Sequence, residues 1–138
     1  MRTATLRYVS EPDPEVLELA HQMFDLARSG ATEALTACVD AGVPVNLTND
    51  KGDSLLILAA YHNHPDTVAA LLDRGAEADR ANDRGQTALA AAVFRQSPGS
   101  VGALLGAGAD PAAGGPSALD TARFYDLPEM LRLLEGAR

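Results

Sequence analysis

The sequence predicts an all-α fold, a solenoid of stacked helical repeats, and three observations support this prediction. The segment at residues 52–79, GDSLLILAAYHNHPDTVAALLDRGAEAD, returns without gaps at residues 85–110 as GQTALAAAVFRQSPGSVGALLGAGAD. The constant offset that places Gly85 on Gly52 also relates Gly42 to Gly75. Residues 115–119, GPSAL, repeat the opening GQTAL of residues 85–89 at a slightly shorter offset. A fixed period of this length is typical of proteins built from stacked repeats.

This period divides the chain into four repeats that follow a short N-terminal tail. Two interpretations stay open for the tail, residues 1–12: a frayed, flexible end, or an extended segment that packs on the first repeat or contacts a partner through Leu6 and Tyr8. The outer two repeats are the most degenerate, as expected of terminal repeats that turn one face to water. We expect the four repeats to form one domain, with approximate boundaries at 13–47, 48–80, 81–111 and 112–138.

The first repeat begins with a helix-start pattern. Asp13 can cap free amide groups and Pro14 suits the first helical position. The helix is expected to run to about Arg28, followed by a second helix at about 31–41. Cys38 takes the place of a repeat leucine, so we expect it to be a buried apolar residue rather than a reactive thiol. The apolar positions of the two helices are Val16, Leu19, Ala20, Met23, Phe24 and Ala27, and Ala34, Leu35, Cys38 and Val39.

The two central repeats share one plan. Ser54 and Thr87 are expected to cap inner helices of about eight to nine residues. Pro65 opens the second helix of its pair, where a missing amide hydrogen does no harm. Gly75 is expected to end that helix with a positive φ, and both features recur one period later. Because isolated helices need roughly 12–15 residues to be stable in water, stability must come from the stacking of neighbours.

These patterns resemble the ankyrin-repeat family over roughly residues 15–136. The family repeat opens with D-x-x-G-x-T, continues with P-L-H-x-A-A, and closes after two leucines with G-A-D. Residues 49–54 (NDKGDS) and 82–87 (NDRGQT) match the opening, while 75–77 and 108–110 match the close. Departures at the family's proline and histidine weaken hydrogen bonding between adjacent turns but leave the packing pattern intact. Those positions hold Leu55, Ala88 and Ala118, and Ile57, Ala90 and Asp120.

The resemblance implies helix-turn-helix repeats joined by projecting β-turn fingers. The polar segments 43–52 and 76–85 are the expected fingers. The shorter segment 109–115, rich in Gly, Ala and Pro, is expected to form a truncated or flattened one. In the last repeat, Glu135 stands where the inner repeats have a leucine, as expected of a solvent-facing cap.

Composition narrows the range of partners. The net charge is -8 and the pI about 4.7, and an acidic surface repels phosphate backbones, so nucleic acid is not an expected partner. A single cysteine allows no internal disulfide, which fits a reducing compartment. The chain has no apolar run of about 18 residues and no signal-peptide core, so no membrane is indicated. We expect a monomeric, cytoplasmic protein, and the Lys-poor, Ala- and Arg-rich composition is typical of a high-GC bacterium.

The sequence contains no recognisable catalytic constellation. It lacks G-x-S-x-G, a phosphate-binding loop, a paired-cysteine motif and H-E-x-x-H. His62, His64 and Asp66 lie in a tight turn, where such side chains seldom converge on one metal ion. His64 also stands at the family's turn-histidine position. We therefore expect no enzymatic activity, no metal site and no cofactor.

Four of the six aromatic residues fall into two adjacent columns when the repeats are aligned. In the ankyrin-repeat family the first column is a variable position that faces the concave groove. Stacked repeats would place its members in a row at roughly the 8–10 Å spacing of packed helices. Two interpretations stay open: the rings pack for stability alone, or they form a partner-binding strip. The columns hold Tyr61, Phe94 and Phe124, and His62, Arg95 and Tyr125.

We predict a non-catalytic module that binds another protein through the concave face of its inner helices and fingers. Residues at the finger tips would form the polar rim of this face. The alternative is an acidic inhibitor or antitoxin-like protein that masks a basic surface, since residues 1–50 carry a net charge of -5. It predicts association rates that fall steeply with salt, whereas an aromatic strip predicts salt-tolerant binding. The expected rim residues are Asp50, Lys51, Asp53, Asp83, Arg84 and Gln86.

Overall fold

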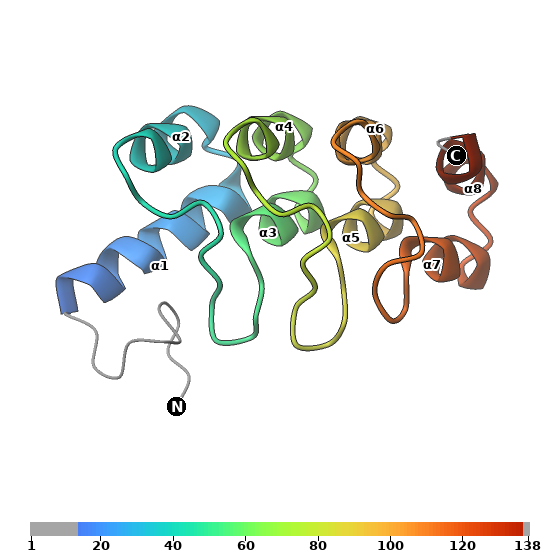
Figure 1. The fold of residues 1–138 in the computed structure, drawn as a ribbon, viewed down its shortest axis with the longest axis horizontal. Coiled ribbons are helices and arrows are strands. Elements are labelled where there is room, and N and C mark those ends of the chain that lie inside the picture. The colour runs from blue at the N-terminus through green and yellow to red at the C-terminus, as the bar shows by residue number, and fades with distance from the viewer. Residues whose placement is uncertain (1–13, 137–138) are drawn as a thin grey trace.

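The computed structural model describes residues 14–136, and the predicted tail at residues 1–12 lies outside this range. Helices in the described part alternate between two rows (Figure 1). The inner row consists of α1 (Pro14–Ser29), α3 (Leu55–Tyr61), α5 (Ala88–Phe94) and α7 (Ala118–Phe124). The outer row consists of α2 (Thr32–Asp40), α4 (Pro65–Asp73), α6 (Pro98–Gly106) and α8 (Pro128–Gly136).

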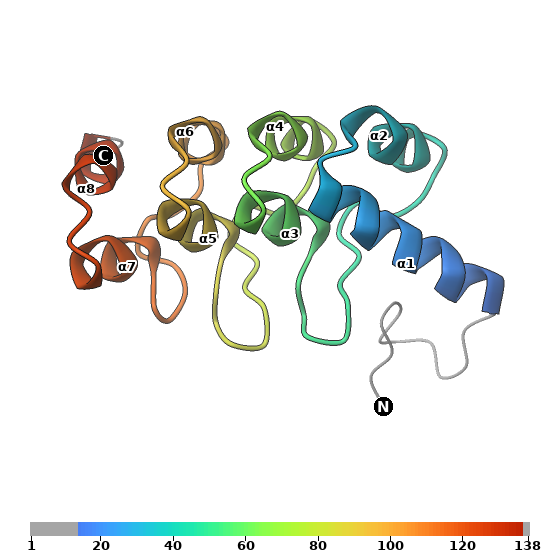
Figure 2. The same ribbon diagram turned by 180° about the vertical axis from the view of Figure 1, so that it is seen from behind.

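Each helix packs on its partner within a repeat and on its counterpart in the next repeat. In the inner row α3 contacts α1 and α5, and α5 contacts α7. In the outer row α4 contacts α2 and α6, and α6 contacts α8. The loops that join the repeats project from the same side of the stack in both views (Figures 1 and 2). The predicted all-α solenoid of helix-turn-helix repeats joined by fingers is confirmed.

The inner helices α3, α5 and α7 span seven residues each, one or two fewer than predicted. Their predicted starts are confirmed, because the hydroxyl of Ser54 accepts a hydrogen bond from the Ile57 amide and that of Thr87 from the Ala90 amide, both at 3.1 Å. Each helix ends early because the second residue after it turns into the left-handed region, where the α-helical ladder cannot continue. Those residues are Asn63, Gln96 and Asp126, with φ of 63°, 53° and 54°.

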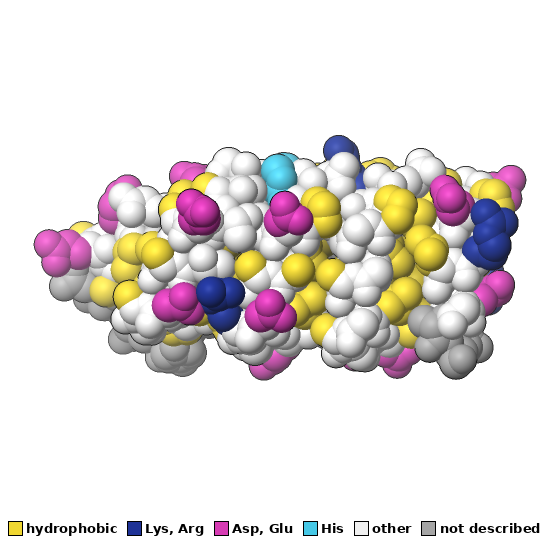
Figure 3. All heavy atoms as spheres, turned by 90° about the horizontal axis from the view of Figure 1, so that it is seen from above, with side chains coloured by type: hydrophobic (Ala, Val, Ile, Leu, Met, Phe, Trp, Pro, Cys, Tyr) yellow, Lys and Arg dark blue, Asp and Glu magenta, His cyan; other side chains and the backbone are white. Residues whose placement is uncertain are grey.

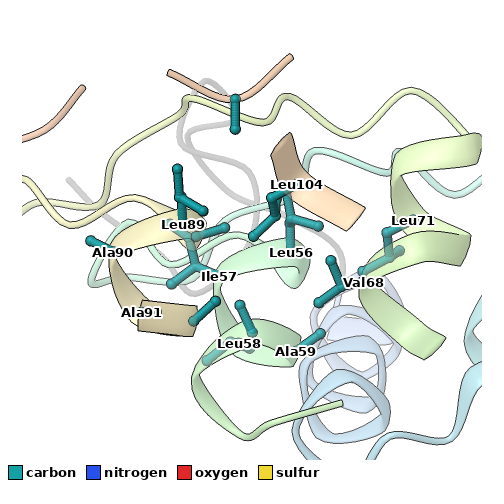
Figure 4. Close-up of a cluster of buried hydrophobic side chains, with 14 of the residues drawn as sticks. Leu56, Ile57, Leu58, Ala59, Val68, Leu71, Leu89, Ala90, Ala91 and Leu104 are labelled. Atoms are coloured by element: carbon teal, nitrogen blue, oxygen red, sulfur yellow. The ribbon is translucent and has the colours of Figure 1, made fainter. Parts of the chain in front are cut away.

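Apolar side chains from both rows form one continuous core. Figure 4 shows Leu56 of α3, Leu71 of α4, Leu89 of α5 and Leu104 of α6 among them, and all four are buried. Burying each leucine contributes roughly 1.5–3 kcal/mol. The inner row also buries many alanines, whose small side chains allow helices to pack closely. The fully buried alanines of this row are Ala27, Ala59, Ala60, Ala88, Ala91, Ala92, Ala118 and Ala122.

The outer helices begin and end as predicted. Pro65 and Pro98 are the first residues of α4 and α6. Gly75 and Gly108 follow these helices with φ of 92° and 91°. Space around Gly75 is open, since a Cβ there would meet no atom within 4 Å. The left-handed backbone, and not crowding, is therefore what favours glycine after the outer helices.

The first repeat buries less than its pattern predicted. Val16 and Leu19 are about two-fifths exposed, because the 16-residue α1 extends beyond the seven-residue α3 on which it packs (Figure 1). In α2, Leu35 is buried, but Ala34 is exposed and Cys38 is half-buried. Within residues 14–136, α2 has a neighbour on only one side of its row. The predicted burial is therefore confirmed for Leu35 and was wrong for Ala34 and Cys38.

The last repeat closes the stack as predicted. Its finger is visibly smaller than the other two in Figure 1, and it ends in a bridge between Gly114 and Ser117. Asp120, at the family's histidine position, forms a capping box instead: its carboxylate accepts from the Ser117 amide, and the Ser117 hydroxyl accepts from the Asp120 amide, both at 3.1 Å. Glu135 is exposed, as expected of a solvent-facing cap.

The surface of the outer row carries scattered acidic side chains (Figure 3). One of them links two repeats: Asp40 of α2 accepts hydrogen bonds from Arg74, which follows α4, at 2.8 and 3.2 Å. The hydrogen bond from Arg74 lowers the pKa of the Asp40 carboxyl, and the same bond raises the pKa of Arg74. Asp40 is exposed and Arg74 is partly exposed, so the pair is expected to contribute little to stability.

Truncation of Leu104 tests the shared core. Leu104→Ala is expected to lower the free energy of unfolding by about 2–5 kcal/mol, because it leaves a cavity between stacked repeats. Leu105 follows it on α6 but is only half-buried, so Leu105→Ala is expected to cost roughly half as much or less. Urea unfolding followed by circular dichroism measures both. Equal losses for the two variants would contradict a core centred on Leu104.

Candidate protein-binding surface

Aromatic rings at the C-terminal ends of the inner helices form a continuous row. The ring of Tyr61 stacks on that of Phe94, with centroids 6.3 Å apart and planes within 4° of parallel. Phe94 meets Tyr125 edge to face at 5.4 Å, and Tyr125 meets Phe124 in the same way at 4.9 Å. We call Tyr61, Phe94, Tyr125 and Phe124 the aromatic row.

The aromatic row differs from the predicted one in its third member. Alignment of the repeats predicted Tyr61, Phe94 and Phe124 in succession, yet the ring next to Phe94 is that of Tyr125. Tyr125 is the C-cap of α7, and from there its side chain reaches Phe94, while Phe124 is 81% exposed. The first two rings are also closer together than the spacing of packed helices, because their side chains meet between the helices.

The aromatic row packs internally and still faces solvent. Each ring pair contributes about 0.5–1.5 kcal/mol beyond its buried area, so part of the row's role is structural. The side chains nevertheless remain well exposed, with 39% for Tyr61, 40% for Phe94 and 52% for Tyr125. Contiguous exposed aromatic surface of this kind is typical of an interaction site.

A groove with a volume of about 390 Å³ adjoins the row, bounded by α3 and the first two fingers. Seven of the residues predicted from the sequence to bind a partner line this groove. The other members of the aromatic row, together with Arg95 and Asp83, do not line it. The predicted residues that line the groove are Tyr61, His62, Asp50, Lys51, Asp53, Arg84 and Gln86.

Two buried asparagines hold the fingers in shape. The Asn49 side-chain oxygen accepts hydrogen bonds from the amides of Lys51 and Asp53, both at 2.9 Å. The Asn82 oxygen does the same one repeat later, at 3.0 and 2.9 Å. The Asn82 amide group donates to the Asp53 carboxylate at 2.8 Å, which ties the two fingers together. The rim of the groove is therefore preformed and does not consist of loose turns.

Comparison with known proteins agrees with this architecture. A family model of ankyrin repeats, in three copies, matches residues 23–114. The chain belongs to the ankyrin-repeat family. A protein of Pseudomonas aeruginosa whose assigned name describes an ankyrin repeat protein is 55% identical over 58 residues, which cover 42% of this chain. The match spans 34% of that relative, about a third of its length.

The same ankyrin period identifies a groove residue that the sequence analysis missed. Arg28 lines the groove at the end of α1, and it lies one full period before Tyr61, as Tyr61 lies before Phe94. The column of aromatic residues therefore begins with a cation. Asn49, Ile57 and Leu58 also line the groove. The sequence did not indicate them as binding residues, because their positions in the repeat match the family's structural pattern.

The two histidines of the α3–α4 turn have different surroundings. The Nε2 atom of His64 lies 2.7 Å from the Arg28 carbonyl oxygen, which joins the first two ankyrin repeats. The ring of His62 meets that of Tyr61 edge to face at 5.3 Å. Within residues 14–136 no three His, Cys, Asp or Glu side chains are grouped so that they could hold a metal ion.

Within residues 14–136, none of the helices of this ankyrin-repeat protein combines the length and the apolar character that crossing a membrane requires.

Titration of His62 tests the electrostatics of the groove. Desolvation lowers the pKa of His62 below its usual 6.5, and the positive charges of Arg28, His64 and Arg95 lower it further. Folding therefore disfavours the protonated ring, and His62 destabilises the fold as the pH drops below 6.5 towards its folded-state pKa. NMR titration of Arg28→Gln should show the His62 pKa moving upwards, but not fully to 6.5, because the desolvation persists.

An equal loss of charge at the far end of the solenoid provides the control. Arg132 lies exposed on α8, and Arg132→Gln should leave the titration of His62 unchanged. The same His62 pKa in the wild type and in Arg28→Gln would contradict an influence of Arg28 on the groove.

Proposed function

We propose that this chain binds a partner protein through the concave face formed by its inner helices and fingers. Ankyrin repeats are in general protein–protein interaction modules, and the family is typically non-catalytic. The single observation that supports the location is the aromatic row, whose rings are ordered by mutual contact yet exposed beside a groove. Aromatic and arginine side chains at such places supply most of the binding energy in typical interfaces.

The groove and the aromatic row serve complementary roles in this proposal. The rings of Tyr61 and Phe94 offer apolar area whose position is already fixed, since each is held by its neighbour. The fingers offer polar groups on a backbone fixed by Asn49 and Asn82. Because little of this surface has to be ordered on association, little conformational entropy is lost when a partner binds.

Removal of two rings tests the proposed surface. Tyr61→Ala with Phe94→Ala should weaken partner binding by about 2 kcal/mol or more, roughly thirtyfold in Kd, if these rings are interface anchors. The partner is first captured from a lysate of the source organism with wild-type protein, and its Kd is then measured for the wild type and the double variant. Circular dichroism verifies that the variant stays folded.

The matched control truncates another exposed apolar side chain. Leu133 on α8 is 37% exposed, close to the 39% of Tyr61, and it lies outside the aromatic row and the groove. Leu133→Ala should leave the affinity unchanged. A folded double variant that binds the partner as tightly as the wild type would show that the surface lies elsewhere.

A further inference from the structure

The side of this acidic protein that carries the fingers presents basic side chains that lack acidic partners within the described residues. The ion pairs of residues 14–136 involve Arg28, Arg74 and Arg80, which meet Asp25, Asp40 and Glu77. The side chains of Lys51 and Arg84, at the tips of the first two fingers, are not among these pairs, although both line the groove.

A third basic side chain extends this set to the aromatic row. Arg95 follows α5, and its guanidinium lies 5.8 Å from the centroid of the Tyr61 ring. It forms no ion pair within residues 14–136. A cation placed over an aromatic ring keeps its outward-facing N–H groups available for a carboxylate. Cations therefore stand on both sides of Tyr61, at the finger tips and beside the rings.

The groove is far less acidic than the chain as a whole. Its lining holds three basic residues and two carboxylates, and with Asp25, the ion-pair partner of Arg28, the formal charge is 0, whereas the chain carries -8. One of the two carboxylates, that of Asp53, already accepts a hydrogen bond from Asn82. Other acidic side chains are scattered over the outer row (Figure 3).

The state of His62 is consistent with this distribution. Desolvation is the larger cause of its lowered pKa, and the positive charges of Arg28, His64 and Arg95 lower that pKa further. Desolvation disfavours a charge of either sign, whereas the potential of these cations, of which Arg28 lines the groove, favours a negative charge.

We propose that the occupant of the groove is an extended, acidic peptide segment of the partner, with one carboxylate at Lys51 and Arg84, another at Arg95, and an apolar side chain on the rings of Tyr61 and Phe94. This inference depends on the proposed function, since it assigns a partner chemistry to the same surface. It opposes the alternative in which this chain covers a basic partner: a basic segment would meet unpaired cations in the groove and leave them without carboxylates.

Selection from a random peptide library tests the inference. Displayed peptides of roughly nine residues, about 30 Å when extended, are selected against the full-length protein. Because the protein carries -8, nonspecific attraction would enrich Lys and Arg, so the expected enrichment of Asp and Glu with an interspersed aromatic or aliphatic residue runs against the net charge.

Charge-removing variants then locate the contacts. The Kd of a synthetic copy of the most enriched peptide is expected to rise about tenfold for Arg84→Gln with Arg95→Gln, because each loses a charged hydrogen bond. Arg84→Lys with Arg95→Lys should recover part of the affinity by retaining charge. Arg132→Gln on α8, together with wild type, is the control and should leave the Kd unchanged.

The outcomes separate the inference from the proposed function. Another outcome is that the library enriches basic or uncharged peptides that no longer bind Tyr61→Ala with Phe94→Ala. This result would contradict an acidic occupant and would still support the proposed protein-binding surface. Acidic peptides that bind the Arg84 and Arg95 variants as tightly as the wild type overturn the assigned contacts. A library that yields no enriched peptide overturns the inference, and the capture experiment with the ring variant then decides the proposed function independently.

Discussion

Contact between neighbouring repeats is the interaction on which every other feature of this protein depends. A helix of seven residues cannot persist in water, and α3, α5 and α7 are all of this length. Each inner helix exists because alanines such as Ala59 and Ala92 let the next one approach and bury it. The paired leucines of the outer row complete the core from the other side. The stability of the fold therefore comes from the contacts between adjacent repeats, and a single repeat is not expected to fold alone.

The same stacking also produces the candidate binding surface. Side chains one full period apart are brought to the same height on successive repeats, so a position that carries Arg28, Tyr61 and Phe94 in sequence becomes a row in space. The candidate surface and the core therefore arise from one period. A substitution in the exposed column removes ring contacts such as that between Tyr61 and Phe94 but leaves the buried leucines in place.

Much of this could be predicted from the sequence, and the failures have physical causes. Caps, prolines and glycines predicted the starts of the inner helices and the bounds of α4 and α6, because each acts within one turn of chain. The inner helices end earlier than predicted, because left-handed residues such as Asn63 carry no such signal. Burial was overestimated for Val16 and Ala34, since the pattern of a single helix does not reveal which neighbours are missing. Tyr125, and not Phe124, is the ring next to Phe94. Alignment of the repeats predicts backbone positions and not the directions in which the side chains point.

Net charge and local charge are separate quantities in this protein. Net charge is a sum over all surfaces, whereas a binding segment samples only the potential within about 10 Å. On the outer row, the carboxylate of Asp40 pairs with Arg74 across two repeats. On the side of the fingers, Lys51 and Arg84 line the groove and form no ion pair among residues 14–136. In an elongated repeat protein the two sides are separated by two rows of helices, so the charge of one side does not predict the partner of the other.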